Sequence, residues 1–289
     1  MTRHVTASLL LLLALARTDA RAQGYGPCLA IYRCPPPAEA PDDRPDARYA
    51  AINAALGALT TGIASLVRGR LPDVETVLTG AIGGAIIYGG KRLVAEPGDG
   101  NGLLGREVAA FGGSLVRNAA AGRPALSSLT FPVGPLRFEI EPGESGRVQV
   151  NLAAVIAAGY FLFERDGAAV DLGATLSTGA LVLVGRGDRP GGMGRHVAGV
   201  VWLAGPQAFD APVVLRHELV HVLQSDQAFA LVGDPLERWL AASHPAIERV
   251  GRHVDFGLES LLTMTMNGLV PYYDRPWEIE AYRITGEPD

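Results

Sequence analysis

The sequence predicts an α+β protein, in which a glycine-rich helical hairpin precedes an antiparallel, strand-rich middle and a helical C-terminal region. Three patterns support this prediction. Two stretches without charge, 49–67 and 77–90, are rich in Ala, Gly and Leu or Ile, which is typical of closely packed helices. Apolar and polar residues alternate around 136–152, as they do along half-buried strands. From Val213 onward the sequence is mostly helical in character.

The composition excludes two classes of protein. Apolar residues make up 48% of the chain, so it is not intrinsically disordered. The formal net charge of -5 provides no basic surface for nucleic acid, and we expect no nucleic-acid partner. With 289 residues, the chain is long enough for one large domain or two small ones.

The N-terminus has the pattern of an export signal. A short basic start precedes an uncharged, leucine-rich run at Ser8–Ala16, and Ala20-Arg21-Ala22 fits the cleavage pattern of small residues. We therefore expect residues 1–22 to be a signal peptide and the mature protein to be periplasmic or extracellular, beginning at Gln23. An uncleaved anchor is the alternative, although the apolar run is short for a membrane span.

Residues 23–48 contain the two cysteines of the chain, Cys28 and Cys34, followed by a proline-rich stretch that indicates an extended tether. In an exported protein a close pair of cysteines predicts a disulfide. A metal or redox pair is the alternative, but the spacing is not Cys-x-x-Cys.

The helical hairpin has two possible environments. Small residues at every third or fourth position let two helices approach closely, and membrane helix pairs use this device. The second segment is short for a span, and polar residues such as Asn53 and Thr60 interrupt the first. The sequence therefore favours a hairpin packed against the rest of the protein, with membrane association through 49–90 as the alternative. The turn between the helices carries Asp73, a suitable N-cap.

The division of the chain follows from these patterns. We expect a signal peptide, a tether, a Gly/Ala-rich helical region, and a strand-rich and then helical region, at 1–22, 23–48, 49–125 and 126–289. The last region should begin with a β-hairpin formed by 136–140 and 148–152. Further strands are expected at 168–172, 181–184 and 199–203. Helices should follow from Asp210 or Pro212, at 235–242, at 246–266 and from Pro276.

The strongest chemical signal is the sequence His217-Glu218-Leu219-Val220-His221. Residues four apart lie on one face of a helix, so both imidazoles can point at one metal ion. Glu218 is adjacent but angularly offset, and its carboxylate can reach a metal-bound water without binding the metal. The surrounding residues are apolar, and a buried helix makes two unpartnered imidazoles costly. The motif therefore predicts a zinc site of the metallopeptidase type.

A catalytic zinc normally has three protein ligands, so one ligand must come from elsewhere. The metzincin pattern would need a histidine or aspartate ten residues after His217, where the chain has Gln227. It would also need a glycine where Gln224 stands. Those departures argue against that family.

The downstream sequence 275–282 resembles the glutamate-ligand zincins, in which a second helix carries Glu-x-x-Ala/Ser-Asp. Glu278 and Ala281 match this pattern, and Tyr282 stands where an aspartate is usual. The resemblance implies that Glu278 is the third zinc ligand, with Glu280 as the alternative. The motif helix is also similar to that of several uncharacterised exported zincin-like families. The likeness covers only these two stretches.

Such zincins usually use a histidine or tyrosine to stabilise the developing oxyanion. The candidates by sequence are His253, Tyr272 and Tyr273. An isolated histidine such as His244 or His253 is more often an ordinary helix-surface residue.

The resemblance implies zinc-dependent hydrolysis of a peptide or protein substrate, with Glu218 as the general base on a zinc-bound water. The alternative is a non-catalytic zincin-like module for binding or assembly in the cell envelope. A membrane-embedded protein is the third hypothesis.

Overall fold

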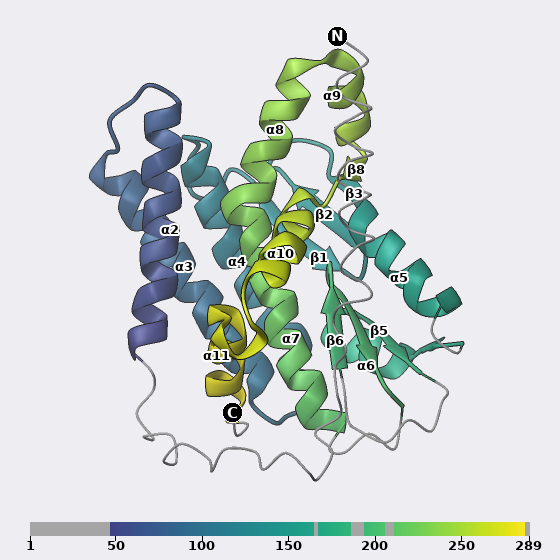
Figure 1. Ribbon diagram of the computed structural model, residues 1–289. Helices are drawn as coiled ribbons and strands as arrows, with labels where there is room; N and C mark the ends of the chain where they lie inside the picture. Colours follow the sequence, from purple (N-terminus) through teal and green to yellow (C-terminus); the bar gives the residue numbers. More distant parts are fainter. Residues whose placement is uncertain (1–46, 165–166, 186–193, 206–210, 287–289) are drawn as a thin grey trace.

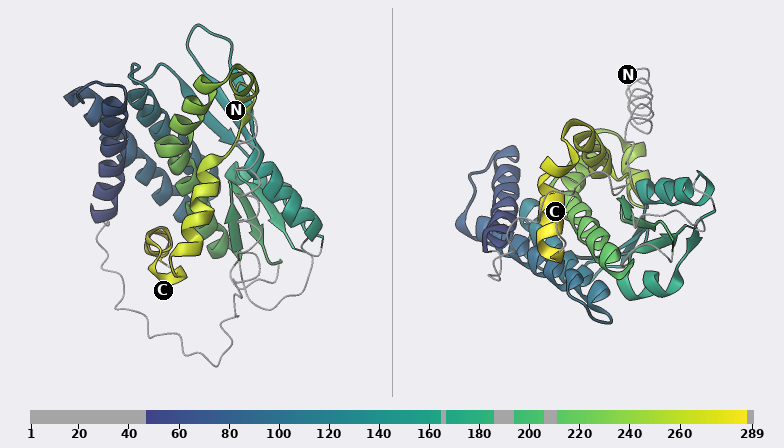
Figure 2. Two further views of the ribbon diagram at one scale, coloured as in Figure 1. Left: turned by 45° about the horizontal axis from the view of Figure 1, so that its top comes forward. Right: turned by 60° about the horizontal axis from the view of Figure 1, so that its bottom comes forward.

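The computed structural model describes residues 47–164, 167–185, 194–205 and 211–286 (Figure 1). The expected signal peptide, the tether and the pair Cys28 and Cys34 lie outside these residues. Helices form one side of the molecule and two small sheets form the other, with helix α7 (Ala211–Ala228) between them (Figures 1 and 2). The α+β class predicted from the sequence is confirmed.

The predicted helical hairpin is present as α2 (Ala47–Val67) and α3 (Val74–Ala95), and α4 (Asn101–Ala120) packs beside it. Asp73 is the N-cap of α3, as expected, because its carboxylate accepts a hydrogen bond of 2.7 Å from the amide of Thr76.

Glycines set the spacing of these three helices. A Cβ atom placed on Gly57 would lie 2.0 Å from the carbonyl oxygen of Gly80, and one on Gly90 would lie 2.4 Å from that of Gly105. Only glycine permits such contact between backbones, so α2 approaches α3, and α3 approaches α4, without intervening side chains.

The first sheet has the strand order β1-β2-β3-β8, with β1 (Leu129–Val133), β2 (Leu136–Ile140), β3 (Arg147–Asn151) and β8 (Val254–Asp255). The predicted hairpin is confirmed: β2 and β3 are antiparallel, with Phe138 opposite Val148. The short strand β8 joins β3 in parallel.

The second sheet has the order β4-β5-β7-β6, with β4 (Ala169–Val170), β5 (Leu181–Val184), β6 (Gly194–Val197) and β7 (Val200–Leu203). The expectation of an antiparallel middle is wrong in part, because β5 and β7 run parallel. The tight turn between β6 and β7 contributes to this arrangement. Ala198 and Gly199 have φ angles of 51° and 80°, which reverse the chain so that β6 lies antiparallel to β7.

Two helices in the middle were not predicted. Asn151 ends β3, and its side chain accepts a hydrogen bond from the amide of Ala154, so α5 (Leu152–Glu164) starts at once. Asp171 caps α6 (Leu172–Thr178) in the same way, which limits the strand predicted at 168–172 to β4.

The C-terminal helices are α7, a π-helical turn η1 (Phe229–Gly233), α8 (Asp234–Ser243), α9 (Pro245–Gly251), α10 (Leu258–Leu269), the turn η2 (Tyr272–Asp274) and α11 (Pro276–Thr285). The single helix expected at 246–266 is wrong, because β8 divides it. Gly257 has a φ of 67°, and the carboxylate of Asp255 pairs with Arg137 of β2, so the chain leaves the helical path here. The final helix begins at Pro276, as predicted.

The main core lies around α7. Leu219, Val220, Val222 and Leu223 are each at most 2% exposed and belong to one apolar cluster with side chains of α3, β5 and β7. Burying one such side chain stabilises the fold by about 1.5–3 kcal/mol. This burial fixes the rotation of α7 about its axis, and therefore the direction of its remaining face.

Candidate metal centre

The remaining face of α7 carries His217 and His221, one turn apart and buried at 5% and 9% exposure. Their neighbours on the helix are the core residues just described, so the imidazoles cannot rotate to the surface without unpacking the helix. The first turn of α11 lies against this face and brings Glu278, which is also buried.

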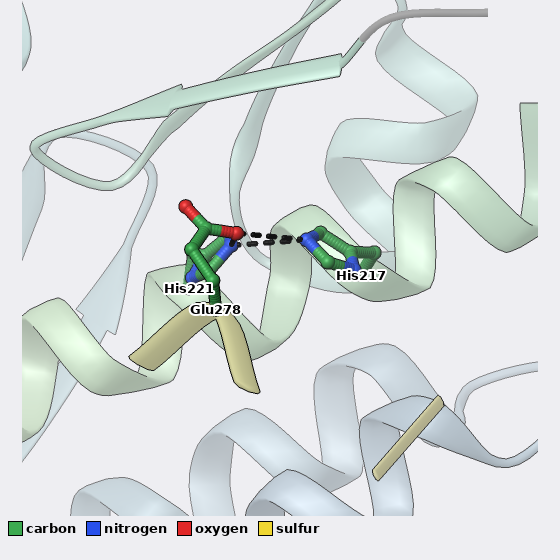
Figure 3. A group of neighbouring side chains, drawn as sticks. All are labelled: His217, His221 and Glu278. Atoms are coloured by element: carbon green, nitrogen blue, oxygen red, sulfur yellow. Dashed lines mark hydrogen bonds and ion pairs between the residues drawn. The ribbon is translucent and has the colours of Figure 1, made fainter. Parts of the chain in front are cut away.

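Three side-chain atoms meet at one point (Figure 3). The Nε2 atoms of His217 and His221 lie 3.1 Å apart. The Oε2 atom of Glu278 lies 3.0 Å from Nε2 of His221 and 3.5 Å from Nε2 of His217. The structure therefore brings together all three residues that the sequence analysis selected as metal ligands.

These distances fit a metal ion bound by three ligands. Ligands placed tetrahedrally at about 2.0–2.1 Å from zinc lie about 3.3 Å from one another. The three separations fall around that value. The donor set of two imidazoles and one carboxylate is also one that zinc accepts in catalytic sites.

The charges of the group support this fit. Burial raises the pKa of Glu278, but hydrogen bonds from His217 and His221 outweigh it and hold the pKa below its usual value. Burial lowers the pKa of His221, but the hydrogen bond and negative charge of Glu278 outweigh it and raise the pKa. The carboxylate of Glu278 thus stabilises positive charge beside it. A divalent cation bound between the three side chains would carry more positive charge than a protonated imidazole.

The ring of His221 is held in place from its other nitrogen. Nδ1 lies 2.7 Å from Oε1 of Gln224, so this nitrogen donates and Nε2 is left to face the group. The amide of Gln224 is fixed in turn, because its Nε2 donates to the carbonyl of Trp277 at 2.9 Å and to Glu280 at 2.7 Å. The role of Gln224 was not predicted from the sequence, although a residue three positions after a ligand is a neighbour on the helix.

Glu280, the alternative ligand, does not join the group. Its carboxylate forms an ion pair of 2.9 Å with Lys91 of α3, and Asn53 of α2 donates to it at 2.7 Å. Lys91 is almost fully buried and also donates to Asn53 and Gln227, at 2.9 Å and 2.7 Å. A buried ammonium needs such a charge partner, and Glu280 is the one it has.

These contacts form one chain of hydrogen bonds, which we call the Lys91 network: Asn53, Lys91, Gln227, Glu280 and Gln224. It connects the glycine-rich hairpin to the ring of His221. One sequence feature points to it, because Lys91, the one lysine of the chain, follows the charge-free stretch 77–90. Nothing local indicates which carboxylate this lysine pairs with.

Glu218 lies beside the three-residue group and is 7% exposed. Strand β6 passes directly over it. A Cβ atom on Gly194 would be 2.6 Å from Oε1 of Glu218, so a larger residue here would displace the carboxylate. Because Gly194 has no side chain, the carboxylate of Glu218 has room beneath β6.

Sequence analysis missed His196, which lies on β6 with its ring stacked 6.4 Å from that of His221. Its Nε2 accepts a hydrogen bond of 2.9 Å from the amide of Gly199, so Nδ1 carries the proton. Burial and the neighbouring charge of His221 lower its pKa to about 3, which keeps the ring neutral. The turn at 198–199 could have indicated a second strand here, and with it a histidine opposite the motif helix.

Of the residues considered for oxyanion stabilisation, Tyr272 is near the site. Its hydroxyl lies 3.1 Å from that of Tyr282, whose ring packs 4.6 Å from the ring of His217. Burial and the charge of Glu278 raise the pKa of Tyr272, so the hydroxyl keeps its proton. At position 282, where the family pattern has an aspartate, this chain has a tyrosine whose ring packs against the ring of His217.

The other candidates lie elsewhere or are not described. His244 caps α9, accepting a hydrogen bond from the amide of Ala246. His253 directly precedes β8, and its carbonyl pairs with β3. The side chain of Tyr273 lies outside the described residues.

A second group meets the same distance requirement. Oxygen atoms of Glu237, Asp255 and Glu259 lie within 4.8 Å of one another. Asp255 is paired with Arg137 and accepts a hydrogen bond from Asn151. Burial, followed by the charge of Asp255, raises the pKa of Glu237 to about 9 and that of Glu259 to about 7. Protons shared among carboxyl groups therefore relieve the repulsion in this group, which we call the carboxyl cluster.

No match was found for this chain among protein-family models, curated proteins or solved structures. The site is therefore interpreted from its own geometry and chemistry.

Proposed function

We propose that this is an exported zinc-dependent peptidase whose metal is held by His217, His221 and Glu278. The observation that carries the proposal is the convergence of two imidazole nitrogens and one carboxylate oxygen within 3.0–3.5 Å, with Glu218 beside them. A bound zinc would lower the pKa of water and polarise a scissile carbonyl.

The residues of the chain have separate roles in this mechanism. Gln224 holds the ring of His221 so that Nε2 faces the group. Glu218 is the general base: it takes a proton from the attacking water and passes it to the amine that leaves when the C–N bond breaks. Tyr272, with its proton retained, is a donor on the Glu278 side of the site.

The position of β6 favours an extended peptide as substrate. Among the described residues β6 pairs with β7 on one side, and no strand pairs with its other side. A peptide in extended conformation can add to such an edge through backbone hydrogen bonds. Because Gly194 on this strand touches Glu218, a peptide bound there would pass close to the general base.

The test combines metal analysis with digestion of a peptide library. Wild type should contain one zinc per chain and cleave peptides. Glu218→Gln should keep the zinc and lose about 10² to 10⁴ in turnover, the usual cost of removing a general base. Glu248→Gln, an exposed change of the same kind on α9, is the control and should behave as wild type.

Two results would contradict the proposal. If Glu218→Gln cleaves a substrate as fast as wild type, the assignment of the base is wrong. If wild type binds zinc stoichiometrically but cleaves no peptide in the library, the chain is instead a non-catalytic module of the same architecture.

A further inference from the structure

Helix α2 has the reverse of the polarity expected for a helix in water. Its buried residues are Asn53, Gly57, Thr61 and Ser65, which are polar or small and lie one turn apart. Apart from Arg48 in the first turn, its large exposed residues are aliphatic: Ile52, Leu56, Leu59, Ile63, Leu66 and Val67. A helix on the surface of a water-soluble protein normally buries its apolar face and exposes its polar face.

The rest of the hairpin extends this apolar face. Leu78 and Ile82 of α3 are each 55% exposed, and Leu71 in the turn is 87% exposed. Between 49 and 67, and again between 77 and 90, every residue classed as exposed is apolar. A continuous apolar face of this kind marks a contact surface.

The length of α2 suits a lipid environment. It is the one helix within the described residues that is long and apolar enough to cross a membrane. However, α2 packs along α3, and α3 packs on α4 and α7, so the protein body accompanies the hairpin along its length (Figures 1 and 2). Among the described residues, one side of α2 is left uncovered. A membrane can therefore meet the hairpin as a surface that lies parallel to the helix.

Positive charges lie near both ends of this face. Arg48 is exposed at the start of α2 and Arg70 just after its end, where Asp73 and Glu75 are exposed as well. The guanidinium of Arg68 instead donates to Ser65 on the inner side of α2. Helices that lie in the membrane interface carry such residues, which attract anionic headgroups.

A cavity adjoins the apolar face at its Arg48 end. It has a volume of about 590 Å³ and is lined by Arg48, Tyr49, Ile52, Pro276, Ile279 and Arg283. Two guanidinium groups beside an apolar wall match an anionic amphiphile, because arginine binds phosphate and the wall can contact an acyl chain. Ile52 belongs both to this cavity and to the exposed face of α2, so the two surfaces are continuous.

We infer that the α2–α3 hairpin docks on an anionic phospholipid membrane, with α2 in the plane of the interface and a lipid phosphate in the Arg48–Arg283 cavity. The inner side of α2 carries Asn53 of the Lys91 network, which connects this helix to the ring of His221 through Glu280 and Gln224. The sequence alone favoured simple packing of the hairpin; α3 does pack, but the outer half of α2 does not.

Vesicle flotation tests the apolar part of this surface in the full chain. Wild type should float with vesicles that contain phosphatidylglycerol. Leu56→Gln/Leu59→Gln should lower the partition coefficient by about 10-fold or more, because two exposed leucines no longer enter the lipid. Residues 1–46 are the same in every variant, so any membrane binding by that segment cancels in the comparison.

The matched control is Leu172→Gln/Leu176→Gln, two leucines of α6 that are 68% and 75% exposed on the opposite side of the molecule. This variant should float as wild type does. If the α2 variant floats equally well, the hairpin does not contact lipid and the inference fails. If wild type resists extraction by carbonate and the α2 variant does not, α2 spans the bilayer and the in-plane arrangement is wrong.

The charge requirement has its own pair of variants. Arg48→Glu/Arg283→Glu should reduce binding to phosphatidylglycerol vesicles to the level seen with phosphatidylcholine alone, whereas Arg249→Glu on α9 should have a small effect.

Glycerol phosphate in solution distinguishes a lipid from a free ligand. If it occupies the cavity as tightly as vesicles bind, the site is for a soluble phosphate compound. If wild type never floats and instead self-associates through α2, the face joins two copies of the chain; either result overturns the inference.

Discussion

Two groups of side chains can be compared directly: the buried metal centre of His217, His221 and Glu278, and the carboxyl cluster of Glu237, Asp255 and Glu259, in which Glu237 is half-buried. In both, three potential ligand atoms lie within 4.8 Å of one another. They differ in charge. The metal centre has two imidazoles facing one carboxylate, whereas the cluster has three carboxyl groups and one paired cation, Arg137.

The difference shows that proximity alone does not define a metal site. In the metal centre the ring of His221 is held by Gln224, and the Lys91 network holds Gln224 through Glu280. The ring of His221 is therefore oriented toward the group without a metal. In the carboxyl cluster the raised pKa values of Glu237 and Glu259 mean that protons already relieve the repulsion. Four variants test the difference between the two groups.

The largest effect on stability should come from Lys91→Met. This change leaves the carboxylate of Glu280 buried without its cation, which typically costs about 3–5 kcal/mol. Chemical denaturation of the metal-free protein measures the loss. The neighbouring change Arg92→Met, at a partly exposed position, should alter the free energy of unfolding by less than about 0.5 kcal/mol. Equal effects would mean that the network does not support the fold.

His221→Ala should remove a ligand and with it the bound zinc. We expect the affinity for zinc to fall by more than about 100-fold and peptide cleavage to disappear with it. Competition with a chromogenic chelator measures the affinity. Glu259→Gln in the carboxyl cluster should leave the zinc content unchanged, and a matching loss in that variant would show that the two groups are not independent.

Gln224→Ala should have a smaller effect at the same site. The three ligands remain, but the ring of His221 loses the partner that fixes its orientation, so zinc affinity should fall by about 10- to 100-fold. Gln149→Ala, which removes a glutamine of β3 that donates to the carbonyl of Gly251 at the end of α9, is the control. If the two glutamine variants bind zinc equally well, Gln224 does not position the ligand.

The smallest effect concerns pH and the carboxyl cluster. Raised pKa values mean that the folded state keeps protons that the unfolded chain releases near its ordinary value of 4.5. Stability from this cluster is therefore fully present below about pH 4.5 and is lost as the pH rises through about 7 and 9.

Glu237→Gln imitates the protonated form, so it should flatten this dependence and raise the free energy of unfolding at pH 9 by about 1 kcal/mol. Thermal unfolding of both proteins from pH 5 to pH 9 measures it. A variant that is less stable than wild type across the whole range would rule out proton sharing at Glu237.

The sequence alone was sufficient for the parts of the site that depend on local geometry. His217 and His221 share a helix face because of the helical repeat, and the apolar residues between and after them required that helix to be buried. The hairpin of β2 and β3 and the start of α11 at Pro276 also followed from short-range patterns. Glu278 could be selected over Glu280 only through resemblance to a family pattern.

Tertiary structure decided the rest, because it depends on segments that are far apart in the chain. Lys91 lies 189 residues from its partner Glu280, and no local pattern links them. His196 reaches the metal centre only because β7 pairs between β5 and β6. The reversed polarity of α2 was likewise not predictable, because it depends on α3 packing against the side of α2 that carries Gly57. Periodicity can identify a helix, but the partners that pack against the helix decide which of its faces is buried.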